Sequence, residues 1–241
     1  AAAAQPAVFT GPRFQVDQLP KATWPGEMDV EVCCVIDPSH FYCHHTSREC
    51  HEILNRLNEE INQHCNSTER SAGDLIPEPG ELCLAFHSKY NAWYRVSVES
   101  VTTDQTFVVQ FVDFGDKLTV SSNDIRPCIA AFLNAPPQVF RAKLAGVEPL
   151  GPSWQIAATE HFQQLTGDKI VHAKVLSQTG PEYSLELSSL ETGKKLATAL
   201  VDMGMATVRD TEAEAPAEDS LASGDSKTAA QVAILQQIQK L

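Results

Sequence analysis

The sequence is poor in positive charge. Its 241 residues contain 18 Lys and Arg against 31 Asp and Glu, so the formal net charge is −13 at pH 7. A chain this acidic has little nonspecific attraction for the phosphates of nucleic acids. The composition favours a basic, arginine-rich partner, and we expect no direct binding of nucleic acid.

Long hydrophobic runs and paired cysteines are lacking as well. No apolar stretch approaches the roughly 20 residues that span a membrane, so we expect no membrane span. Residues 1–12 have neither a charged start nor an apolar core, which argues against a signal peptide. The seven cysteines are odd in number and include no CxxC pair, which favours free thiols in a reducing compartment.

What the sequence does contain is a pronounced β-hairpin pattern. Residues 93–101 alternate between two faces, and residues 106–114 are rich in Phe and Val. A short polar stretch, 102–105, separates the two runs and Gly115 follows the second. Alternation, β-branched residues and a polar break together predict a hairpin.

Aromatic residues gather at the ends of these strands. They are Phe86, Tyr90, Trp93, Tyr94, Phe111 and Phe114. Strand ends at one rim of a small barrel converge, so several rings there can form a box. Trp93 points away from Tyr94 and is assigned to the core, the usual place for such a ring. Phe111 and Phe114 have opposite parity, so we expect a bend at Gly115 to turn Phe114 into the box.

Here the chain resembles a known family. The motif WYR at 93–95, followed by FVDFGD at 111–116, is similar to that of the Tudor domain, and the flanks resemble those of the extended Tudor type found in germline Tudor proteins. The family holds methylated arginine in a cage of four aromatic residues and one polar residue. Carried over position by position, the resemblance implies a cage of Phe86, Tyr94, Phe111, Phe114 and Asp116.

The chain departs from the family pattern at some of these positions. It has Asp116 where the family often has Asn, and Phe where the family often has Tyr. Tyr90 is an alternative cage wall. Arg95 and Asp113 lie within the motif, and we interpret them as a structural pair that braces the hairpin.

The flanks of the hairpin predict further elements. We expect a hairpin at 28–46, a helix at 48–64, a strand at 139–144, an amphipathic helix at 154–165 that uses Trp154, Ile156, Phe162 and Leu165, strands at 169–177 and 182–187, and a helix at 193–203. This order resembles the extended Tudor fold. It implies a mainly β protein with a few helices, in which a Tudor (SH3-like) barrel is inserted into an OB-like, staphylococcal-nuclease-like lobe.

The same resemblance implies the domain organisation. Residues 15–209 form the extended Tudor domain, with the Tudor barrel at 80–124. Residues 28–66 and 138–209 together form the OB-like lobe. We expect an acidic disordered linker at 210–227, because large apolar residues are nearly absent there, and a short helix at 228–241.

Two further hypotheses, a zinc site and a nuclease site, compete with a purely structural explanation of the same residues. Cys43, His44, His45, Cys50 and His51 cluster in sequence, but their spacing matches no common zinc pattern, so we expect free thiols and imidazoles and no metal. The OB-like lobe suggests a nuclease. Such an enzyme needs converging carboxylates around a metal ion, whereas Glu182, Glu186 and Arg209 are scattered.

Three functions stay open at this point. The resemblance implies a noncatalytic reader of arginine-rich, dimethylated peptides, such as the tails of PIWI-class proteins, acting without a cofactor in the cytoplasm or in germ granules as a scaffold of the germline small-RNA (piRNA) pathway. A structural scaffold with a degenerate cage is the second hypothesis. A nuclease is the third.

Overall fold

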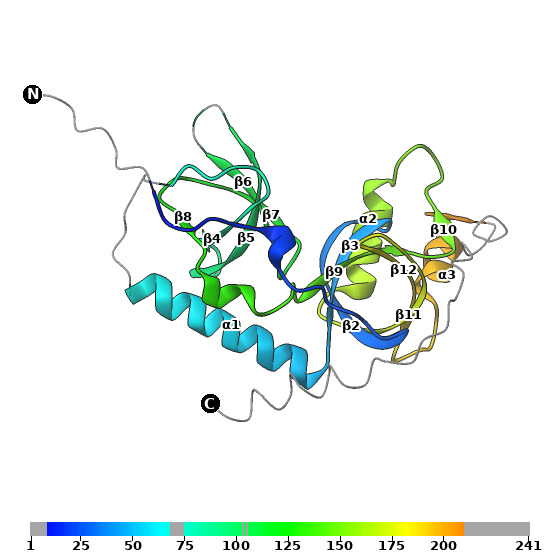
Figure 1. Ribbon diagram of the computed structural model, residues 1–241. Helices are drawn as coiled ribbons and strands as arrows, with labels where there is room; N and C mark the ends of the chain where they lie inside the picture. Colours follow the sequence, from blue (N-terminus) through cyan, green and yellow to red (C-terminus); the bar gives the residue numbers. More distant parts are fainter. Residues whose placement is uncertain (1–8, 68–74, 103, 105, 210–241) are drawn as a thin grey trace, which may run out of the picture. The chain divides into compact units, whose positions relative to one another are not determined.

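The architecture combines one antiparallel sheet with one closed barrel (Figure 1). The computed structural model describes residues 9–67, 75–102, 104 and 106–209. The predicted fold class, mainly β with a few helices, is confirmed. The linker expected at 210–227 and the helix expected at 228–241 lie outside the described residues.

The sheet is built around the predicted hairpin. Its six strands are β1 (Phe14–Gln15), β4 (Glu81–His87), β5 (Ala92–Val101), β6 (Phe107–Phe111), β7 (Lys117–Val120) and β8 (Ile125–Pro127), with β8 paired to β4. Strand β6 ends at Phe111, three residues before the predicted end, because residues 112–114 form a turn. Trp93 is buried, as its parity predicts.

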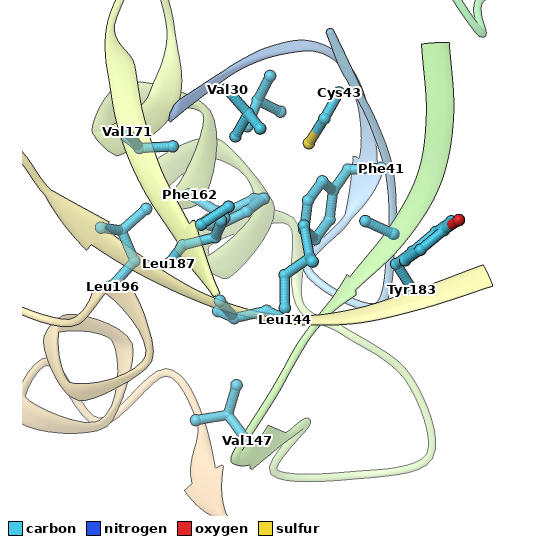
Figure 2. Packing of buried hydrophobic residues seen from close by; sticks show 14 of the residues in the cluster. Val30, Phe41, Cys43, Leu144, Val147, Phe162, Val171, Tyr183, Leu187 and Leu196 are labelled. Atoms are coloured by element: carbon cyan, nitrogen blue, oxygen red, sulfur yellow. The ribbon is translucent and has the colours of Figure 1, made fainter. Parts of the chain in front are cut away.

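The closed barrel is separate from this sheet and lies in the part of the chain expected to form the OB-like lobe. Its strands come from before and after β4–β8 of the sheet in the sequence. It closes through β2 (Glu27–Asp37), β3 (His40–His45), β9 (Val139–Leu144), β12 (Glu182–Ser189) and β11 (Ile170–Thr179), and only the β12–β9 pairing is parallel. Figure 2 shows its core, where Phe41, Phe162 and Leu187 meet among aliphatic side chains. The short strands β10 (Val147–Glu148) and β13 (Thr207–Val208) pair with each other.

Two helices cover the barrel. Helix α2 (Ile156–Thr166) inserts Phe162 into its core, and α3 (Leu196–Asp202) adds Leu196 and Leu200. The prediction that Ile156 packs inward is wrong, since 78% of its surface is exposed at the first position of the helix. Trp154 precedes the helix, and its indole Nε1 donates to Ser39 Oγ at 2.8 Å.

Helix α1 (Arg48–Ser67) packs on the sheet (Figure 1). Its buried residues Leu57, Ile61 and Cys65 recur every fourth position and contact Trp93 and its neighbours. The side chain of Asn62 holds the backbone of Trp93 through two hydrogen bonds of 2.8 and 3.0 Å. The sequence predicted that residues 28–66 all belong to the OB-like lobe. In the structure α1 packs on the sheet instead, because its apolar stripe matches the outer face of the sheet.

The remaining helical turns are short. The 3-10 turn η1 (Val16–Gln18) follows β1, and η2 (Ala130–Leu133) places Phe132 in the same cluster as α1. No helix among the described residues is long and apolar enough to cross a membrane.

Candidate functional site

A cleft of about 650 Å³ lies between the sheet and the barrel. The sheet side supplies aromatic residues, and the barrel side supplies strand β2 and the end of α2. The residues that line it are Glu31, Val32, Cys33, Cys34, Val35, His44, His51, Leu54, His87, Tyr90, Tyr94, Phe111, Phe114, Asp116, Gln163, Thr166, Gly167 and Asp168.

Three of the predicted cage residues meet in this cleft with their rings nearly perpendicular. The Tyr94 ring centroid lies 5.1 Å from that of Phe114 at 78°, and 6.0 Å from that of Phe111 at 79°. Parity explains why Tyr94 and Phe111 share a face: Val96 pairs with Phe111, and Tyr94 is two residues from Val96 on the same strand. Edge-to-face contacts of this kind also occur in cores; here Phe111 is almost fully buried in the core of the sheet, whereas Tyr94 and Phe114 are partly exposed.

Phe114 reaches the same face through a turn. The backbone N–H groups of Phe114 and Gly115 both donate to the carbonyl of Phe111, at 3.2 and 2.7 Å. Gly115 has a φ of 90°, which favours glycine, and a Cβ there would lie 2.2 Å from the Tyr42 ring. The bend expected at this glycine is present, and no side chain fits in its place.

The structure corrects the position of Phe86. Its register partner on β5 is Trp93, so both rings lie on the opposite face from Tyr94, with centroids 5.4 Å apart. Phe86 packs against the cluster beneath α1 and does not line the cleft. The carry-over fails here because a single residue of offset in a strand moves a side chain to the other face.

His87 and Tyr90 line the cleft where Phe86 was expected to. The ring of His87 lies 4.6 Å from that of Tyr90 and 5.1 Å from that of Phe111. Tyr90 is 59% exposed, and Lys89 Nζ lies 5.1 Å from the centre of its ring. Tyr90 was predicted as an alternative wall. His87 was missed, although its parity with Ala85, the partner of Tyr94, could have indicated it.

Asp116 provides the polar group of the cleft. Its side chain is 41% exposed, and Oδ2 lies 3.6 Å from His87 Nε2. Burial raises the pKa of Tyr94, and the nearby Tyr90 and Asp116 raise it further. The Tyr94 hydroxyl therefore stays protonated, and Asp116 supplies the carboxylate beside the rings.

Arg95 and Asp113 form a buried pair behind the rings. Arg95 Nη2 donates to Asp113 Oδ1 at 2.7 Å, and Nε donates to Oδ2 at 2.9 Å. Neither residue lines the cleft. Their contacts are those of a structural pair that braces the strand and the turn carrying Tyr94 and Phe114.

The residues considered for a zinc site and for a nuclease site have ordinary structural contacts. Cys50 Sγ lies 3.6 Å from His45 Nδ1, and in the part of the chain that the structure describes no three His, Cys, Asp or Glu residues gather as metal ligands do. Glu182 pairs with Arg141 at 3.0 Å, and Glu186 pairs with Lys195 at 2.6 Å. These two carboxylates belong to partly exposed ion pairs of the barrel.

Comparison with known proteins gives consistent matches. The Tudor domain family model matches residues 25–146. Human Tudor domain-containing protein 1 is 30% identical over 165 residues, which are 68% of this chain and 14% of that protein. Its relative from Oryzias latipes is 34% identical over 172 residues, 71% of this chain and 15% of that protein. The chain thus spans about one seventh of the length of these relatives.

Solved structures are similar over most of the chain. Extended Tudor domain TD3 from mouse TDRD1, in complex with a MILI peptide containing dimethylarginine 45, has a TM-score of 0.74 at 26% identity, covering 80% of this chain and 98% of that one. The Drosophila melanogaster Papi extended Tudor domain, in complex with a Piwi N-terminal peptide, has a TM-score of 0.69 at 19% identity, covering 77% and 100%. The second likeness concerns the fold alone. With the family model matching half of its length, this chain belongs to the Tudor domain family, and its described residues have the fold of an extended Tudor domain.

Proposed function

We propose that this chain is a noncatalytic reader of arginine-rich peptides that carry dimethylarginine. The observation that carries the proposal is the set of rings from Tyr90, Tyr94, Phe111 and Phe114 beside the carboxylate of Asp116 in one cleft. His87 contributes a further wall.

The chemistry of this box suits a methylated guanidinium. A guanidinium attracts the face of an aromatic ring, with about 0.5–2 kcal/mol for a good contact. Methylation keeps the charge but removes N–H donors, so aromatic faces with a single acceptor match the modified side chain. A box with many acceptors would favour the unmodified one.

The charge of the cleft supports a basic ligand. Its lining includes three carboxylates, Glu31, Asp116 and Asp168, and no Lys or Arg. Glu31 and Asp168 belong to the barrel side, away from the rings. A cleft of about 650 Å³ has room for peptide residues that flank the methylarginine. Basic residues of the peptide at those positions would be attracted to these carboxylates.

One similar structure supports the partner class. Mouse TDRD1 TD3 was solved with a dimethylarginine peptide of MILI. We therefore place the N-terminal tails of PIWI-class proteins first among partners. We propose accordingly that the chain acts in the cytoplasm or germ granules, as a scaffold of the germline small-RNA pathway.

A calorimetric titration tests the proposal. One arginine-rich peptide is prepared with unmethylated, symmetric and asymmetric dimethylarginine. We expect dissociation constants on the order of micromolar or weaker, because one cage supplies only a few kcal/mol. Phe114→Leu should weaken binding strongly. Phe86→Leu makes the same change on the opposite face of the sheet and should leave affinity unchanged.

The outcomes separate this function from its rivals. Equal losses in the two Phe→Leu variants would contradict the cage. A folded chain that binds none of the three peptides would favour the structural scaffold with a degenerate cage. Cleavage of DNA or RNA with calcium, magnesium or manganese, lost in Glu182→Gln or Glu186→Gln, would show a nuclease.

A further inference from the structure

The turn that carries Phe114 is held from outside its own sheet. Strand β6 ends at Phe111 and β7 begins at Lys117, so residues 112–116 connect the two strands. Three side chains of the barrel hairpin, Cys33 on β2 and Tyr42 and His44 on β3, contact this connection.

His44 makes the most direct contact. Its Nε2 lies 2.6 Å from the carbonyl oxygen of Asp113. A carbonyl only accepts, so Nε2 carries a proton and donates, which both the neutral tautomer and the imidazolium can do. The same imidazole lies edge-on to the Phe114 ring, with centroids 5.5 Å apart at 76°. One side chain therefore fixes both the backbone and the ring of the turn.

Cys33 and Tyr42 also contact this connection between β6 and β7. The register of β2 shifts between Val32 and Cys34, and such a bulge re-aims a side chain. The Cys33 thiol lies within donating distance of two carbonyls, that of Phe114 at 3.2 Å and that of Tyr42 at 3.4 Å. Tyr42 packs its ring against Gly115, while its hydroxyl accepts from Gln110 Nε2 at 2.7 Å, and Gln110 also donates to the Gly115 carbonyl at 3.0 Å.

The opposite side of the turn is already fixed within the sheet. Arg95 holds the carboxylate of Asp113, while His44 holds the carbonyl of the same residue. The sheet thus fixes where the turn starts, and the barrel fixes where Phe114 lies relative to Tyr94.

We propose that His44 is a positioning residue for peptide binding: the barrel hairpin sets the Phe114 wall of the cage, with Cys33 assisting. The inference rests on the proposed reader function. It predicts that a substitution of His44, which belongs to the barrel and not to the sheet that carries the rings, lowers the affinity for peptide. The affinity falls because the ring of Phe114 is displaced.

The experiment compares His44→Ala, His44→Gln and His40→Ala in the full chain. Gln keeps an N–H donor that can reach the Asp113 carbonyl. His40 is on the same strand, and its ring contacts Asp37, so its loss is the matched control. We expect His44→Ala to weaken binding of the dimethylarginine peptide about tenfold, His44→Gln by no more than about threefold, and His40→Ala hardly at all.

A second readout does not depend on peptide. Backbone amide NMR signals of Phe114 and Gly115 should shift in His44→Ala and return toward their wild-type positions in His44→Gln. If wild type binds none of the peptides, the proposed function fails while these signals still test the positioning. Unchanged signals in His44→Ala would overturn the positioning role whatever the affinity.

The remaining outcomes are also decisive. If His44→Ala bound the peptide as tightly as wild type, the proposal would be overturned. It would also be overturned if His44→Gln lost as much affinity as His44→Ala, because the imidazole itself would then contact the peptide. Should His44→Ala fail to fold, Cys33→Ala removes the second contact to the turn. We expect about a threefold loss of affinity from that variant, and full affinity would count against the proposal.

Discussion

The carboxylate of Asp113 accepts two hydrogen bonds from the guanidinium of Arg95, at 2.7 and 2.9 Å, and both side chains are almost completely buried. Arg95 also donates to the carbonyls of Phe132, Ala135 and Pro136, and Asp113 accepts from the backbone of Gln138. The pair joins the hairpin of the sheet to the segment that leads into the barrel.

Removing one partner of this pair should be costly. Asp113→Ala leaves a buried guanidinium without its carboxylate, and we expect a loss of about 3–5 kcal/mol in the free energy of unfolding. Urea denaturation measures it. Glu99→Ala is the control, because the Lys117–Glu99 pair is exposed and should contribute less than about 1 kcal/mol. Similar losses in both variants would contradict a bracing role.

Asp116→Asn should change selectivity. A carboxylate accepts charge-assisted bonds that are roughly twice as strong as neutral ones, and the unmethylated guanidinium offers more donors than the dimethylated one. We therefore expect modest discrimination in wild type. Asp116→Asn should lower the affinity for both peptides and widen the preference for the methylated one. Calorimetry with the two peptides measures this. A narrower preference would mean that Asp116 does not contact the guanidinium.

The sheet should depend on its flanks. Residues 80–124 alone would expose Trp93, Leu82 and Leu84, which α1 and η2 cover in the structure. A chain shorter than about 60 residues also buries a thin core. We expect the 80–124 fragment to melt at a markedly lower temperature than the 15–209 fragment, as measured by circular dichroism. Equal melting temperatures would show that the sheet folds independently.

Stability should fall in alkaline solution. Burial raises the pKa of Cys65 and of Cys128 from 9.0 to about 11. Above pH 9 these thiols ionise in the unfolded chain but stay protonated in the folded one, so the unfolded state binds fewer protons and stability drops as pH rises toward 11. The loss is on the order of 2 kcal/mol per thiol.

Urea unfolding between pH 8 and 11 checks this expectation. The Cys65→Ala, Cys128→Ala double variant should start from a lower stability but lose less of it across that range. The difference between the two slopes isolates the thiols from the other groups that ionise there. Parallel slopes would contradict the assignment.

The local elements could be read from the sequence because their signals are local. Alternation and turn residues predicted the β5–β6 hairpin, and the strand at 139–144 has its predicted bounds. The bend at Gly115 followed from the opposite parity of Phe111 and Phe114. Ile156 shows the limit, since it fitted a helical stripe but lies at an exposed helix end.

The lining of the cleft was predicted in part. Tyr94, Phe111, Phe114 and Asp116 line the cleft, whereas Phe86 does not and His87 takes part instead. The turn between β4 and β5 decides which of two neighbouring side chains faces Tyr94, and its length and pairing register are known only from the structure.

The sequence by itself determined the strand periods, the strong acidity and the motif that resembles the Tudor family, because each depends on residues close together in the chain. The tertiary structure alone decided that α1 covers the sheet, that Glu31 and Asp168 line the same cleft as the rings, and that His44 holds the turn of Phe114. The contact of His44 with Asp113 joins residues 69 positions apart. No local pattern encodes such partners, because they are chosen by the packing of whole surfaces during folding.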